Sequence, residues 1–80
     1  MDLHLRTQLE ELAERLHLHR GSAQDKAQLL GNDVKAALDN GEHDGLNDRL
    51  AEGAIDFESD HPQLAATIRR AVDALSALGI

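Results

Sequence analysis

The chain has 80 residues, no cysteine and a formal net charge of −7. This length fits one small helical domain over residues 1–80, and the lack of cysteine excludes disulfides, thiolate metal sites and cysteine nucleophiles. Proteins bind nucleic acids and anionic membranes through clustered Lys and Arg side chains. The excess of acidic residues therefore argues against both as partners. No apolar run reaches the length of a membrane span or a signal sequence, and we therefore expect a cytoplasmic protein.

Leucines predict a first helix over residues 2–20. They recur at steps of four, three and four, which places on one helical stripe Leu5, Leu9, Leu12 and Leu16. Opposite charges four residues apart support the helix: Asp2 with Arg6, Arg6 with Glu10, and Glu11 with Arg15. We expect His17 and His19 in the last turn, where cations interact favourably with the carbonyl end, and Gly21 as the stop.

A second amphipathic segment follows from Ser22, which we expect to be its N-cap. The apolar stripe consists of Ala23, Ala27, Leu30, Val34 and Ala37. Gly31 costs up to about 1 kcal/mol relative to Ala inside a helix, and the sequence GND could instead be a stop followed by a new cap at Asp33. Because the stripe stays in phase across Gly31, we predict one helix, bent or straight at that point, ending at the turn pair Asn40-Gly41.

The last two predicted helices meet at Pro62. We expect the third to begin at Asp44 as its cap, with the stripe Leu46, Leu50, Ala54 (with Gly53) and Phe57. Pro62 suits the first turn of the fourth helix because it has no N–H. A residue before proline is disfavoured in helical geometry, so His61 is the expected N-cap. The fourth stripe is Leu64, Ile68, Ala71, Val72, Leu75 and Leu78.

The chain carries a C-terminal stop signal in Gly79, which we expect in the left-handed conformation, with Ile80 packed on Leu75 as in a Schellman motif. Four amphipathic helices joined by short turns predict an all-α fold. Two arrangements fit: a small antiparallel bundle of about four short helices, or a dimer of helical hairpins.

Residues 57–80 carry the pattern F-E-x-x-H-P-x-L, then an apolar helix, then G-I. The matching positions are Phe57, Glu58, His61, Pro62, Leu64, Gly79 and Ile80. With the Leu- and Glu-rich N-terminal segment, this pattern resembles a family of short bacterial proteins catalogued as a domain of unknown function. The middle of the chain, around Gly31 and residues 39–45, carries no part of the resemblance. The resemblance implies a small helical bacterial protein and no particular chemistry.

Five acids recur at every fourth residue in the second half of the chain: Asp44, Asp48, Glu52, Asp56 and Asp60. Each pair of like charges at this spacing destabilises a helix by about 0.2–0.5 kcal/mol. The row is either a docking ridge for a cationic partner or divalent ion, or a solvated face, the commoner case. In a dimer, Arg69 and Arg70 of a second chain could also offset it.

Metal ligands are poorly spaced in this sequence. An EF-hand loop beginning at Asn40 would need a bidentate Glu at its twelfth position, where Ala51 stands. His17 and His19 are two residues apart and so point in different directions on a helix. His43 lies near Asp39, Glu42 and Asp44 and could bind a metal opportunistically. We predict no metal or cofactor site.

A catalytic site is not indicated either. Ser59, Asp60 and His61 are adjacent, but a triad is defined by geometry, and neighbours at a helix joint need not converge. The chain has no glycine-rich phosphate loop. We therefore expect a non-enzymatic acidic helical module for protein interaction or oligomerisation, forming a homodimer and binding an unknown protein. The alternative is a metal- or cation-responsive regulator that uses the acidic segment 39–60.

Overall fold

A computed structural model describes residues 3–41 and 43–79, which contain helices and turns and no strand. The helices are α1 (Leu3–Leu18), α2 (Gln24–Asn40), α3 (Leu46–Glu58) and α4 (Pro62–Ala77). The prediction of an all-α fold with four helices is confirmed.

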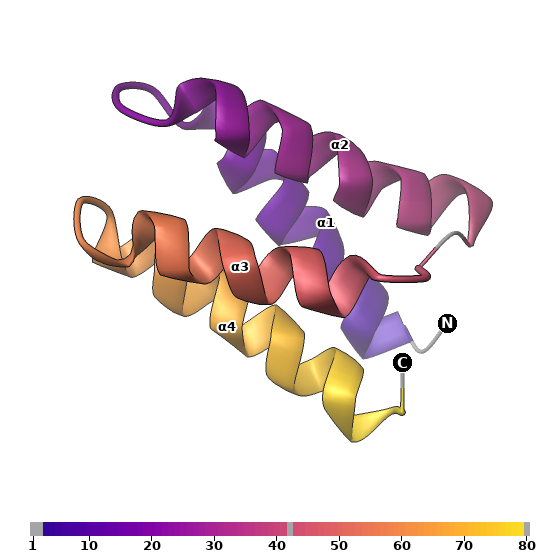
Figure 1. Ribbon diagram of the computed structural model, residues 1–80. Helices are drawn as coiled ribbons and strands as arrows, with labels where there is room; N and C mark the ends of the chain where they lie inside the picture. The colour runs from indigo at the N-terminus through magenta and orange to yellow at the C-terminus, as the bar shows by residue number, and fades with distance from the viewer. Residues whose placement is uncertain (1–2, 42, 80) are drawn as a thin grey trace.

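The four helices form two antiparallel hairpins that pack against each other. α1 packs on α2, α3 packs on α4, and contacts between α1 and α4 and between α2 and α3 close the bundle. In Figure 1, α2 and α3 lie in front of α1, and α4 runs beside α3. The resulting body measures 32 × 21 × 19 Å. A single chain thus closes its own core, so the fold corresponds to the bundle and does not require the dimer of hairpins.

The predicted apolar stripes face one shared core. The largest fully buried side chains come from all four helices: Phe57, Leu5, Leu9, Leu12, Leu16, Leu46, Leu50, Ile68, Leu75 and Val34. Three stripe members, Ala23, Leu64 and Val72, are only partly buried at the edge of this core. Leu78 departs from the prediction, because α4 ends at Ala77 and leaves the Leu78 side chain 51% exposed.

The N-caps predicted for the second and third helices are wrong. The residues at these positions are Ala23, with φ 63°, and Gly45, with φ 74°, and neither makes a side-chain cap bond. Side-chain capping requires an N-cap residue in the extended region, whereas the chain enters both helices through the left-handed region. Ser22 and Asp44 therefore lie in the preceding turns.

Other helix boundaries agree with the sequence. α2 runs unbroken through Gly31 and ends at a left-handed Gly41. Pro62 begins α4 directly after His61. Gly79 has φ 77°, as expected for a left-handed stop, while the predicted contact of Ile80 lies outside the described residues.

Candidate functional site

The predicted acidic row is divided between a helix and its two flanking turns. Asp48, Glu52 and Asp56 lie on α3, whereas Asp44 precedes the helix and Asp60 follows it. All five side chains are exposed. The row is therefore not one continuous helical ridge, and the part carried by α3 is limited to three carboxylates.

Two ion pairs connect α3 to α2. Asp56 lies 3.6 Å from Lys26, and Arg49 donates from Nε to Asp33 at 3.1 Å. These contacts neutralise one carboxylate of the row and both cations of the α2–α3 interface. Within residues 3–41 and 43–79, Asp48 and Glu52 make no ion pair.

Between the two ion pairs, the close approach of α2 and α3 depends on a glycine. A β-carbon built at Gly53 would lie 2.6 Å from Cδ2 of Leu30, which is closer than real contacts allow. The missing side chain lets Leu30 rest on the backbone of α3. Sequence reasoning placed Gly53 on the stripe of the third helix but did not identify its partner.

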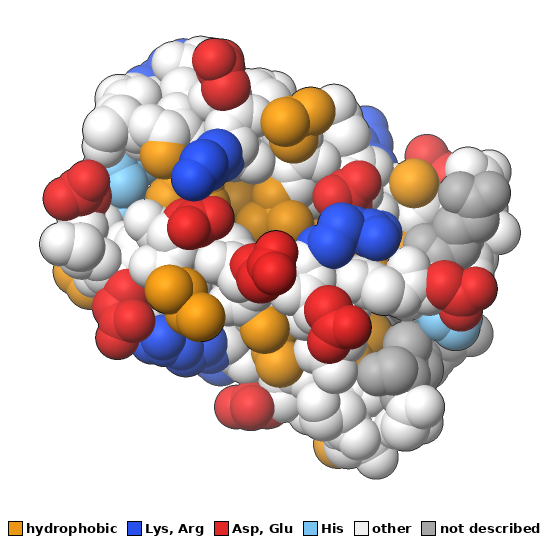
Figure 2. Space-filling model, viewed as in Figure 1, with side chains coloured by type: hydrophobic (Ala, Val, Ile, Leu, Met, Phe, Trp, Pro, Cys, Tyr) orange, Lys and Arg blue, Asp and Glu red, His pale blue; other side chains and the backbone are white. Residues whose placement is uncertain are grey.

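A shallow hollow of about 230 Å³ lies along this α2–α3 contact. Its apolar lining consists of Leu29, Leu30, Gly53 and Phe57, and charged side chains of both helices form its rim. Leu29 is 66% exposed at the edge. Figure 2 shows apolar atoms at the centre of this face, surrounded by acidic and basic side chains. We call this hollow with its rim the α2–α3 groove.

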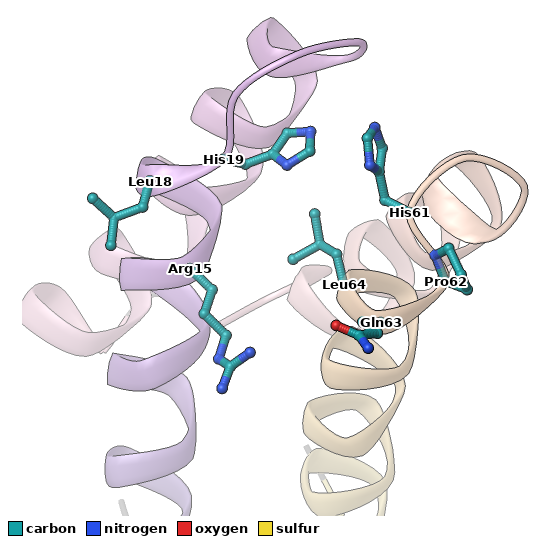
Figure 3. A pocket seen from close by; sticks show the side chains of 7 residues that line it. All are labelled: Arg15, Leu18, His19, His61, Pro62, Gln63 and Leu64. Carbon is teal, nitrogen blue, oxygen red and sulfur yellow. The ribbon is translucent and has the colours of Figure 1, made fainter.

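A second cavity, of about 500 Å³, lies between the C-terminal end of α1 and the first turn of α4. Figure 3 shows His19 and His61 facing each other at its upper end, with Arg15 and Leu64 below. The two imidazole centroids are 4.3 Å apart in an edge-to-face arrangement. The ring of His19 also packs edge-to-face on Phe57, with 5.7 Å between the ring centroids.

The histidines at this end join two turns of the chain. His61 Nε2 and Ser22 Oγ are hydrogen-bonded at 2.9 Å, and Nε2 of His19 donates to the carbonyl oxygen of Ser22 at 3.0 Å. The serine hydrogen-bonded to His61 is Ser22, which is distant in sequence. No described carboxylate bonds to His61, so the third member of a triad is missing among these residues.

Of the two histidines predicted for the last turn of the first helix, His17 lies there and His19 does not. α1 ends at Leu18, which leaves His19 in the following turn. His17 is half-buried, and its Nδ1–H donates to Oε1 of Gln28 at 2.9 Å. The amide of Gln28 returns a hydrogen bond to the carbonyl oxygen of His17 at 3.0 Å. The side chain of His17 packs against Gly31, which is buried on α2. A glycine in phase with the apolar stripe is the sequence feature that could have indicated such a bulky neighbour.

The family of the chain follows from its sequence as a whole. The model of the family described as Domain of unknown function (DUF4404) matches residues 5–80. The chain belongs to the DUF4404 family. The match includes the middle segment, around Gly31 and residues 39–45, that the resemblance left uncovered. No curated protein and no solved structure gives a significant match.

The remaining predicted ligand residues of this DUF4404 chain stay apart. Within residues 3–41 and 43–79, no three His, Asp or Glu side chains are grouped so that they could hold a metal ion. Glu42, which the proposed calcium loop and the His43 cluster both include, lies outside those residues. The metal-responsive alternative stays a prediction. None of its described helices is long and apolar enough to cross a membrane.

Proposed function

We propose that this protein is a non-enzymatic protein-interaction module whose binding surface is the exposed face of α2 and α3. The observation that carries the proposal is an apolar groove whose rim includes Glu52, a carboxylate with no ion pair among the described residues. Asp48, which also has none, lies one helical turn before Glu52 on α3. Single exposed leucines are ordinary on protein surfaces. An apolar hollow with a charged rim that retains unpaired acids is more typical of a place where another protein binds.

The charges of this face favour a basic partner. Lys26 and Arg49 are already engaged by Asp56 and Asp33 within the chain. The face therefore presents negative charge that its own cations do not offset, in a protein whose formal net charge is −7. Complementary charge accelerates encounter and disfavours acidic competitors.

Self-association stays a prediction, and the same charges bear on how it would occur. A two-fold dimer through the α2–α3 face would place the acidic residues of one copy against those of the other. Arg69, which could offset the row of a second chain, bonds to Glu58 of its own chain at 3.0 Å. We therefore propose that a homodimer uses a surface other than the α2–α3 face.

A charge-reversal experiment tests the proposed function. The double variant D48K/E52K reverses the unpaired carboxylates, and E11K/E14K makes the same change of net charge on α1, at exposed positions of that helix. The wild-type protein is immobilised, exposed to an extract of its own organism, and the retained protein is identified, purified and tested for direct binding. We expect one basic protein to bind the wild type and E11K/E14K but not D48K/E52K. Equal binding by all three proteins, or no direct binding, overturns the proposal.

A further inference from the structure

We infer that the α2–α3 groove binds an amphipathic helix of a basic partner, which inserts aliphatic side chains beside Leu29 and places Lys or Arg next to Asp48 and Glu52. This inference rests on the proposed function and adds to it the shape and chemistry of the bound segment. It is carried by the lining of the groove, its length and its charges.

The lining of the groove is apolar, and most of its side chains lie below the protein surface. Phe57 forms part of it and is only 1% exposed, and Leu30 is 7% exposed. Position 53 contributes no side chain, because a β-carbon there would collide with Leu30. Leu29 stands at the edge with 66% of its surface exposed. An inserted aliphatic side chain would cover Leu29 and exclude water from the groove, which is the main source of affinity at such contacts.

The two ion pairs set the length of the groove. On α2, Lys26 and Asp33 mark its ends, and they are separated by about 10 Å along the helix axis at 1.5 Å per residue. Apolar side chains three or four residues apart on one helix lie about 5–6 Å from each other. The groove thus accommodates neighbouring apolar side chains from successive turns of a helix that lies along α2 and α3, a common mode of helix recognition.

The charges around the groove decide which occupant is expected. Glu52 belongs to the rim, and Asp48 lies one helical turn before it on α3. A nucleic acid would be repelled by these groups, and a second copy of this chain on the same face would bring its own acids to them. A segment with Lys or Arg beside its apolar stripe satisfies both the lining and the rim.

Synthetic peptides test the inference directly. The first probe is an alanine-based helical peptide with two leucines four residues apart and lysines on either side of them. The second has glutamine in place of the leucines, and the third has glutamate in place of the lysines. Each is titrated into the wild type, into L29S and into L3S, a control that replaces another exposed leucine distant in sequence; Leu3 is 77% exposed and Leu29 66%.

We expect the lysine–leucine peptide to bind the wild type and L3S alike, and to shift the amide resonances of Leu30 and Gly53. The glutamine peptide and the L29S variant should each weaken binding about tenfold, because each removes a buried aliphatic contact. The glutamate peptide should not bind. In 1 M salt the lysine–leucine peptide should keep part of its affinity, since only the charged contacts are screened.

The outcomes separate this inference from the proposed function. If the glutamine peptide binds as tightly as the leucine peptide, or if L29S binds like the wild type, the groove is not used and the inference is overturned. The same holds if light scattering shows a dimer that the L29S change dissociates, since a second copy would then be the occupant. If the peptide results overturn the inference, the proposed function can still hold. It holds if a protein partner binds the wild type and E11K/E14K but not D48K/E52K.

Discussion

The imidazole of His17 lies on Gly31, with its Nε2 atom 2.9 Å from the position that a β-carbon at Gly31 would occupy. The ring cannot move away freely, because its Nδ1–H is bonded to Gln28. α1 and α2 therefore meet at a place where one helix carries a bulky ring and the other carries no side chain.

This contact reverses the usual effect of replacing a helical glycine. Gly to Ala inside a helix ordinarily stabilises by about 1 kcal/mol, but an overpacked contact in a core costs about 1–3 kcal/mol. We expect G31A to lower the free energy of unfolding by about 1 kcal/mol, measured by urea denaturation. In the H17A background the same substitution should stabilise by about 1 kcal/mol. A gain in stability from G31A in the wild type would contradict the observed contact.

Phe57 is the only Phe, Tyr or Trp of the chain, and we expect its replacement to lower stability strongly. Phe57 is 1% exposed and lies at the end of the core near His19. Replacing a buried Phe by Ala costs about 3–5 kcal/mol, which is a large part of the total stability of about 5–15 kcal/mol typical of small domains. We expect F57A to be mostly unfolded at 37 °C by circular dichroism and F57L to stay folded. I55A on the same helix, where Ile55 is 66% exposed, should change stability by no more than about 0.5 kcal/mol.

The ion pairs that border the α2–α3 groove should contribute little to stability. The side chains of Lys26 and Asp56 are 63% and 44% exposed, and exposed pairs are worth about 0.2–1 kcal/mol. A double-mutant cycle with K26A and D56A should give a coupling energy in that range, which falls in 1 M salt. A coupling of several kcal/mol at high salt would be incompatible with pairs on an open surface.

Pro62 sets the start of α4 without being required for the fold. Alanine at this position keeps the helix but gives the unfolded chain more freedom, so P62A should lower stability by about 0.4–1 kcal/mol. The hydrogen bond between His61 and Ser22 and the buried ring of Phe57 should keep α3 and α4 antiparallel. We expect the helix content by circular dichroism and the mass by light scattering to equal those of the wild type. A larger species would indicate that α3 and α4 had merged into one helix.

The period of the apolar residues was sufficient to predict the helices and most of the core. Leu5, Leu9, Leu12 and Leu16 are buried as their spacing required, because the pattern of a stripe is a local property of the chain. The caps at Ser22 and Asp44 were predicted wrongly, because the left-handed residues that follow each of them redirect the chain. Residue preferences at caps do not record that choice of backbone conformation.

The candidate site was predictable only in part. The spacing of Asp48, Glu52 and Asp56 placed them on one face of a helix, and the structure agrees. The groove beside them depends on how α2 packs on α3, including the close contact of Leu30 with Gly53. Such a relation between residues distant in sequence has no local signature, so the apolar half of the site appears only in the folded chain.

The pairing of helices adjacent in sequence, α1 with α2 and α3 with α4, has a consequence for how quickly the protein folds. Each hairpin closes a short loop, and proteins dominated by local contacts fold in about microseconds to milliseconds. The slow step should be the docking of one hairpin on the other, which brings His61 to the turn at Ser22. Temperature-jump relaxation would then show a main phase on the millisecond scale or faster, and a slower phase whose rate rises with protein concentration would point to assembly of a second chain.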